Sequence, residues 1–104
     1  FDSNVAAEAL PTVNAIGSVL YPHDIERGGN DARVGSDIGP IQKLGVPAFS
    51  LGQDGIDYFD YHHTANDTLD KIDAKKLDQN VAAYAAFAYL AAEAEHKIAA
   101  PKQP

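Results

Sequence analysis

Only two segments of this 104-residue chain have the composition of β-strands, and this scarcity limits the fold more than any other feature. The first is Tyr21–Arg27, which runs into the turn-forming residues 28–31. The second is Val46–Leu51, a short apolar run between glycines that is typical of a buried parallel strand. Pro47 suits the first position or an edge of that strand. Because two strands do not form a stable sheet alone, the pattern predicts part of a larger sheet.

The first half of the chain contains two predicted helical segments. Residues 3–20 place apolar side chains at helical spacing behind a possible N-cap, Asp2 or Ser3. Pro11 favours a kinked or broken helix; alternatively, the helix begins near Leu10 with Pro11 in its first turn.

A shorter helix is predicted at Ile38–Leu44. Ser36 or Asp37 is placed to cap its beginning, and Gly45 is placed to end it. The segment therefore has the pattern of loop, helix and glycine stop.

The strongest helix prediction is Ala74–Ala99, because half of residues 81–100 are alanine, the best helix former. Asp73 is its expected N-cap. The face expected to pack inward consists of Leu77, Val81, Tyr84, Ala88 and Ala91. Residues 101–104 are expected to be a frayed tail.

The alternation of helices and strands predicts an α/β fold, in which residues 1–104 are one part of a larger doubly wound domain. A chain that begins at Phe1 and contains no Met fits a fragment.

Composition excludes several functions. The net charge of −7 disfavours nucleic acid and anionic membrane surfaces, which need clustered Lys and Arg. The absence of cysteine leaves His, Asp and Glu as the strong metal ligands. No apolar run approaches the roughly 20 residues that span a bilayer.

Polar residues gather in Gly52–Asp73, which is expected to be an ordered functional loop that follows a strand. It contains the run Tyr-His-His-Thr-Ala-Asn-Asp-Thr at residues 61–68. Neutral imidazole binds zinc well, and a carboxylate four residues after His63 can hold the ring or close the loop. The residues alone leave open whether one histidine binds metal or both lie exposed in a turn.

Residues 35–55, residues 57–73 and the alanine-rich helix together resemble the end of the dizinc aminopeptidase family, especially its plasma glutamate carboxypeptidase-like enzymes. The resemblance extends from about Asn4 to Glu95. It implies the C-terminal portion of a three-layer α/β/α sandwich of the zinc exopeptidase type, ending in a long alanine-rich helix. It also implies a secreted or periplasmic enzyme.

The resemblance implies a role for five residues. In the family pattern His-Thr/Ser-x-x-Asp-Thr the histidine is the last zinc ligand, which selects His63 over His62 by its spacing to Asp67. His62 takes the place of a tyrosine that steadies the oxyanion in some relatives. The loop Gly35, Ser36 and Asp37 corresponds to one that lines the substrate pocket.

The other family ligands, a His-x-Asp pair, a Glu-Glu pair and a further Asp, have no counterpart in this chain. One ligand cannot hold two zinc ions, since each needs about four donors. The prediction is therefore part of a zinc-dependent aminopeptidase or dipeptidase that acts on peptides, with the isolated chain inactive and the remainder of the catalytic domain as its partner. The alternatives are a non-catalytic module like the transferrin receptor and a glutaminyl cyclase.

Overall fold

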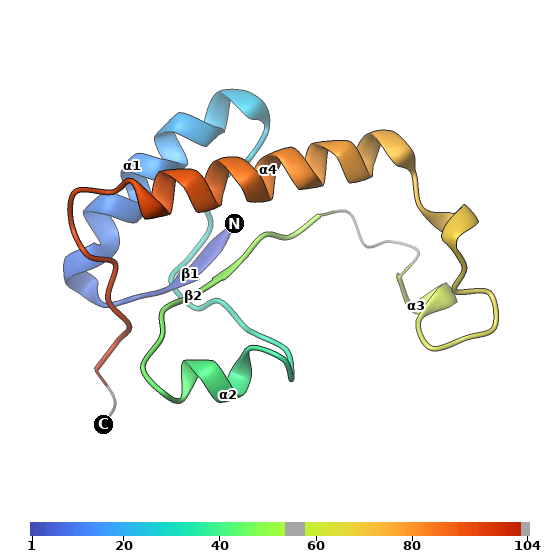
Figure 1. Cartoon of the computed structure of the whole chain (residues 1–104), viewed down its shortest axis with the longest axis horizontal. Helices are drawn as coiled ribbons and strands as arrows, with labels where there is room; N and C mark the ends of the chain where they lie inside the picture. Colours follow the sequence, from blue (N-terminus) through green and yellow to red (C-terminus); the bar gives the residue numbers. More distant parts are fainter. Residues whose placement is uncertain (54–57, 103–104) are drawn as a thin grey trace.

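The computed structural model describes residues 1–53 and 58–102, which form a small sheet with helices around it (Figure 1). The elements, in chain order, are β1 (Asp2–Asn4), η1 (Ala7–Ala9), α1 (Leu10–Leu20), η2 (Tyr21–His23), α2 (Gly39–Gln42), β2 (Ala48–Ser50), α3 (Tyr58–Tyr61), η3 (Leu69–Lys71) and α4 (Ala74–Ala92). Figure 1 shows α1 and α4 above the strands and α2 below them. This arrangement is an α/β fragment.

The two strands are antiparallel, with Asp2 opposite Ser50 and Asn4 opposite Ala48. The prediction of a strand at Val46–Leu51 is confirmed for its centre, but the predicted parallel orientation is wrong within this chain. Its partner β1 was not predicted, because Asp, Ser and Asn are poor strand formers. Hydrogen bonds to β2 and to residues 28–32 stabilise β1 despite its low strand propensity.

The other side of β1 pairs with residues 28–32. The Ser3 N–H donates to the Gly29 carbonyl at 3.0 Å, and the Ala32 N–H donates to the Ser3 carbonyl at 2.9 Å. The fully buried Ser3 hydroxyl donates to Asn30 Oδ1 and accepts from Arg27 Nη2, each at 2.7 Å. Burial of this polar group is therefore compensated by hydrogen bonds.

Tyr21–Arg27 is not a strand. Its first part is the 3₁₀ helix η2, which ends where Asp24 adopts a left-handed φ of 62°. Pro22 in this segment favours a turn, because proline fixes φ and cannot donate to a strand ladder.

Helix α1 begins at Leu10 with Pro11 in its first turn, so this alternative is confirmed and the longer kinked helix is wrong. Proline is tolerated there because the first-turn N–H groups have no partner within the helix. Asp2 and Ser3 belong to β1 and cap no helix.

Helix α2 is shorter than predicted. Its N-cap residue is Ile38, without a side-chain cap hydrogen bond, so capping by Ser36 or Asp37 is wrong. Gly45 follows the helix with φ of 88° and donates its N–H to Gln42 O at 3.0 Å. Glycine ends the segment as predicted, because it adopts this conformation without strain.

Helix α4 confirms Asp73 as N-cap, since its carboxylate accepts the Lys76 N–H at 3.0 Å. The helix ends at Ala92 rather than Ala99. The predicted inward face is confirmed at Ala91, which packs against the core, but is wrong for its other members. Phe87 is the buried residue of the helix, while Leu77, Val81 and Tyr84 are 47%, 61% and 51% exposed. Both faces are apolar, so the sequence pattern alone does not choose between them.

The core lies where α1 and α4 meet the sheet. One buried group contains Val5, Ala9 and Val13, and the other contains Ile16, Leu20 and Phe87. The Phe87 ring packs against Phe1 and Phe49, with centroid distances of 5.0 and 4.7 Å. This aromatic group joins α4 to both the chain start and β2.

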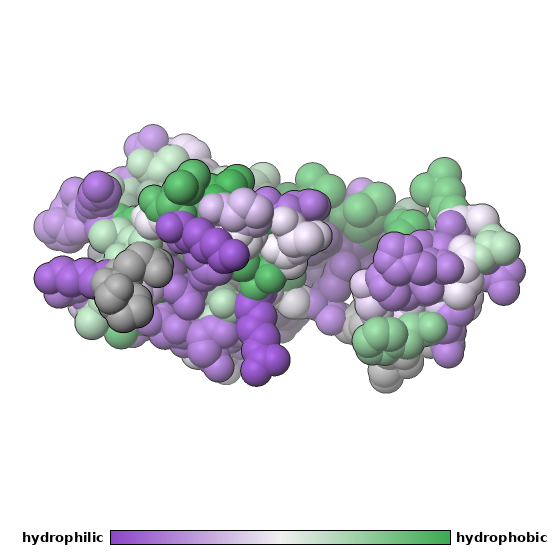
Figure 2. Space-filling view, turned by 90° about the horizontal axis from the view of Figure 1, so that it is seen from below, coloured by the Kyte–Doolittle hydropathy of each residue, from purple (hydrophilic) through white to green (hydrophobic). Residues whose placement is uncertain are grey.

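Much apolar surface stays uncovered. Leu44, Phe59 and Leu69 are 84–85% exposed. Figure 2 shows green hydrophobic residues at the surface of both the larger body and the smaller lobe at its right end, which contains α3 and η3. None of the helices in the described part of the chain is long and apolar enough to cross a membrane.

Two predictions lie partly outside the described residues. These are the functional loop Gly52–Asp73, at residues 54–57, and the frayed tail, at residues 103–104. The rest of that loop is more regular than predicted, since it contains α3 and η3.

Replacing Phe87 by Ala should lower the free energy of unfolding by about 3–5 kcal/mol, because it removes the ring that joins α4 to the sheet. Chemical denaturation measures this change. Tyr89→Ala is the matched control, since Tyr89 lies on the same helix and is 66% exposed. Equal losses for the two variants would contradict the assigned inward face.

Candidate functional site

The two adjacent histidines lie in a tight turn that follows α3. The His62 N–H donates to Tyr58 O at 2.9 Å, and the Thr64 N–H and hydroxyl both donate to Tyr61 O, at 3.0 and 2.7 Å. These local hydrogen bonds fix the main chain on both sides of His63. The turn geometry therefore does not depend on distant parts of the chain.

The His62 ring is held by aromatic neighbours. It stacks on Tyr58 with centroids 4.7 Å apart and an angle of 24°, and it meets Phe59 edge-on at 6.4 Å. The His63 ring is its third neighbour, at 3.9 Å. Such contacts restrict the ring while leaving His62 exposed to solvent.

His63 has an unusual main chain and an accessible ring. Its φ of 54° is in the left-handed region, where histidine is commoner than most residues but where a side chain still costs about 1 kcal/mol or more. The residue is exposed, and neither ring nitrogen has a hydrogen-bond partner among residues 1–53 and 58–102. Within the described part of the chain, both nitrogens are therefore open to a ligand.

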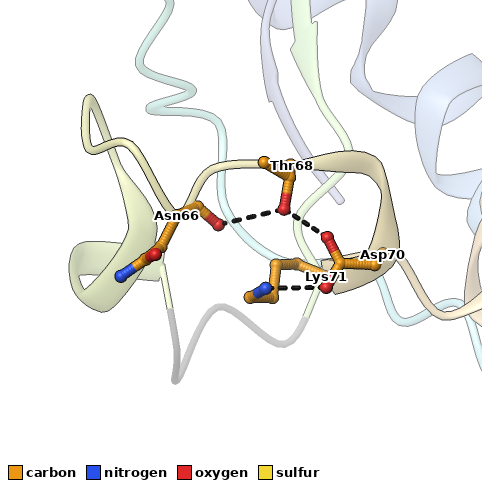
Figure 3. Close-up of polar contacts among 4 residues, drawn as sticks. All are labelled: Asn66, Thr68, Asp70 and Lys71. Carbon is orange, nitrogen blue, oxygen red and sulfur yellow. Dashed lines mark hydrogen bonds and ion pairs between the residues drawn. The ribbon is translucent and has the colours of Figure 1, made fainter.

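The Asp67 carboxylate does not hold the His63 ring in the described part of the chain. Asp67 contributes through its main chain instead, donating its N–H to Thr64 O at 3.1 Å. The Thr68 hydroxyl donates to the Asp70 carboxylate and lies 3.4 Å from Asn66 O, which closes this part of the loop (Figure 3).

Two residues of this loop were not singled out from the sequence. Lys71 Nζ lies 2.8 Å from Asp70 Oδ2 (Figure 3). It also lies 5.6 Å from the Tyr61 ring centroid. The Lys71 ammonium first, and the Thr68 hydroxyl second, hold the pKa of the Asp70 carboxyl below its ordinary value of 3.8. The spacing Thr-x-Asp-Lys at residues 68–71 is the only sequence signal for this arrangement.

The predicted substrate loop Gly35–Asp37 forms the turn before α2. The Gly35 carbonyl accepts the N–H groups of Ile38 and Gly39, at 3.3 and 2.9 Å. Figure 1 shows α2 and α3 well separated, so the described chain does not itself bring this loop to the histidine turn. Its contact with substrate stays a prediction.

The described residues contain no group of three or more His, Asp or Glu side chains that could hold a metal ion. His63 fits one position of a zinc site by its donor type and exposure, but zinc needs about four ligands. Other ligands would have to come from elsewhere in a larger domain.

A cavity of about 410 Å³ lies away from the histidine turn, between α4 and the residues after β2. Its lining includes Phe1, Ile25 and Leu51 together with Asn80 and Ala83 of α4. It contains none of the predicted site residues.

Comparison with known proteins assigns the chain to a family. Residues 2–88, most of the chain, match the model of peptidase family M28. The chain belongs to peptidase family M28. It is also similar to Carboxypeptidase Q of Rattus norvegicus, with 34% identity over 91 residues that make up 88% of this chain and 19% of that protein. Human Carboxypeptidase Q is 34% identical over 64 residues, 62% of this chain and 14% of that protein.

The fold agrees with the family. The 1.70 Å crystal structure of a peptidase M28 precursor from Shewanella amazonensis is similar with a TM-score of 0.86 and 48% identity, over 99% of this chain and 23% of that one. The chain thus spans about a fifth of the length of these M28 relatives.

Acid should weaken the Asp70 interaction. Because the folded loop lowers the pKa of Asp70, its stabilisation is complete above the ordinary value of 3.8 and is lost as the pH falls through the lower folded value. A carboxyl-carbon NMR titration should give a midpoint below 3.8 for Asp70, and Lys71→Met should raise it. Lys97→Met is the control and should leave the Asp70 midpoint unchanged. An Asp70 midpoint that stays the same in Lys71→Met would contradict Lys71 as the cause of the lowered pKa.

Proposed function

We propose that this chain is the C-terminal part of the catalytic domain of a zinc-dependent exopeptidase, an aminopeptidase or dipeptidase, that hydrolyses peptide bonds with a metal-activated water. The observation that carries the proposal is the exposed imidazole of His63, whose ring nitrogens lack hydrogen-bond partners in the described residues of an M28 chain.

His63 is the proposed zinc ligand of this chain. The turn that fixes its main chain presents the ring to solvent at a left-handed φ, an unfavourable conformation of the kind that often marks functional sites. When bound, a zinc pair would polarise the scissile carbonyl and activate the water. The remaining ligands would come from the remainder of the domain, because this chain supplies one.

His62 is the proposed oxyanion donor. Stacking on Tyr58 and the edge contact with Phe59 restrict the ring, so its N–H can be aimed before the substrate binds. A pre-aimed donor stabilises the developing negative charge by about 3 kcal/mol. The proposal separates the roles of the two neighbours: His63 holds metal, and His62 donates a hydrogen bond.

The other assignments follow from the resemblance. Gly35, Ser36 and Asp37 would line the substrate pocket of the whole domain. The domain would be a three-layer α/β/α sandwich, to which helices above and below the strands give partial support (Figure 1). The substrate would be a peptide or dipeptide, and the enzyme would be secreted or periplasmic.

In the whole protein, His63→Ala should remove about one zinc per chain and abolish hydrolysis, because one ligand is lost. Metal content by mass spectrometry and peptide hydrolysis measure this. His96→Ala is the matched control, since His96 is an exposed histidine outside the site.

Unchanged zinc content in His63→Ala would refute the metal assignment. A whole protein that binds no zinc would favour the non-catalytic alternative, and one that cyclises N-terminal glutamine would favour the cyclase. The isolated 104-residue chain should bind metal weakly and hydrolyse nothing.

His62→Ala should lower kcat by about 100- to 1000-fold and leave zinc content unchanged, because it removes a transition-state donor. His62→Tyr should recover part of kcat, since a phenol can donate the same hydrogen bond. Steady-state kinetics separate kcat from KM. A full kcat in His62→Ala would exclude the oxyanion role.

A further inference from the structure

Arg27 and Asn30 form a hydrogen-bonded anchor around β1. The Asn30 amide accepts the Val5 N–H at 3.1 Å and donates to the Val5 carbonyl at 2.9 Å. Its oxygen also accepts the hydroxyl of the fully buried Ser3 at 2.7 Å. Arg27 Nη2 donates to the same hydroxyl, also at 2.7 Å. The side chains of Arg27 and Asn30 are therefore joined through Ser3.

Arg27 makes further contacts with separate parts of the chain. Its Nη1 donates to Gly29 O and, at 3.4 Å, to Phe1 O. Its Nε donates to Asn14 Oδ1 of α1 at 3.3 Å, and its guanidinium carbon lies 5.3 Å from the Phe1 ring centroid. A planar guanidinium can serve several acceptors at once, whereas a lysine ammonium is a single point charge. Arg27 thus connects the segment 27–32 to the chain start and to α1.

The main chain of this segment also packs closely against β1. Gly28 donates its N–H to Phe1 O at 2.7 Å, and a Cβ at Gly28 would lie 2.0 Å from Oδ1 of Asp2. Ala32, at the far end of the segment, is buried and donates its N–H to Ser3 O at 2.9 Å. The segment is therefore fixed to β1 at both of its ends.

Strand β1 lies between the two predicted parts of the site. On one side it pairs with β2, after which the chain continues to the histidine turn. On the other side it holds the segment 27–32, which leads on to α2 (Figure 1). Only Arg33 and Val34 separate this segment from the predicted substrate loop, Gly35–Asp37. The position of that loop relative to β1 therefore depends on the anchor.

We propose that Arg27 and Asn30 are positioning residues, which fix the loop Gly35–Asp37 for substrate binding through their hydrogen bonds to β1 and its neighbours. Neither residue would contact the substrate or zinc. The inference rests on the proposed function, because it takes this loop to line the substrate pocket. A small displacement of groups that position a substrate is costly, since recognition depends on geometry. Loss of the anchor should therefore act on KM more than on kcat.

Kinetics of the whole protein test the effect on substrate binding. The substrate is the dipeptide that the unaltered protein hydrolyses fastest in a panel of unblocked dipeptides. Asn30→Ala should raise KM at least about fivefold, with kcat within about twofold and zinc content unchanged, because only the binding loop is displaced. Asn30→Asp should recover part of this loss, since its carboxylate still accepts the Val5 N–H and the Ser3 hydroxyl. An unchanged KM in Asn30→Ala would refute the proposal.

Two control variants separate positioning from general stability. Asp31→Ala should leave KM unchanged, because Asp31 is exposed and its side chain makes no hydrogen bond in the described part of the chain. Leu90→Ala should destabilise the fold through the second core group, away from the anchor, and also leave KM unchanged. A KM that rises with loss of stability in Leu90→Ala as it does in Asn30→Ala would make the anchor merely structural and overturn the proposal.

Amide hydrogen exchange of the zinc-free whole protein tests the anchoring itself. The peptide of residues 32–39 contains the bonded amides of Ala32, Ile38 and Gly39. In Asn30→Ala this peptide should exchange at least about tenfold faster, because its attachment to β1 is weakened. Unchanged exchange would refute the anchoring. Faster exchange with an unchanged KM would show that the loop does not bind substrate and would also overturn the proposal.

Arg27→Lys decides the question if Asn30→Ala does not fold. It keeps a cation near the Phe1 ring but loses the planar fork, so KM and the exchange of residues 32–39 should both rise. No change in either would refute the proposal. A whole protein without hydrolysis would refute the proposed function and with it the role in substrate binding, whereas the exchange measurement would still decide the anchoring.

Discussion

The contact of the Phe87 ring with Phe1 and Phe49 is the interaction on which the rest of this structure depends. It fixes α4 to the chain start and to β2, with centroid distances of 5.0 and 4.7 Å. By doing so it also fixes the rotation of α4 about its axis. Leu77, Val81 and Tyr84 are exposed because Phe87 takes the inward position. Packing at one ring thus decides which apolar face of α4 is exposed.

Short-range hydrogen bonds stabilise the histidine turn, whereas a hydrophobic core stabilises the helices and the sheet. Tyr58, Tyr61 and Thr64 supply the main-chain contacts around His63, and Thr68, Asp70 and Lys71 close the following segment. This local support is sufficient to place His63 at a left-handed φ with an exposed ring. The proposed ligand can therefore be positioned by its own loop, whereas a complete metal site would need further residues from a larger domain.

Elements with strong local signals were predictable, and those that depend on partners were not. Asp73 caps α4 and Gly45 ends the α2 segment because each acts on its own neighbours. Strand β1 has a sequence unfavourable for a strand and exists because β2 and residues 28–32 pair with its two sides. In the site, the adjacent histidines were evident from sequence, whereas the Asp70–Lys71 pair was not, since charged neighbours are common in exposed loops.

The sequence by itself determined the α/β character, the alanine-rich closing helix and membership of peptidase family M28, because these depend on residue pattern and motif spacing. Only the tertiary structure decided the antiparallel pairing of β1 with β2 and the inward face of α4. Strand direction and helix rotation depend on contacts between residues far apart in the chain. Two apolar helix faces of similar composition cannot be distinguished from the sequence, because the packing of Phe87 decides which face is buried.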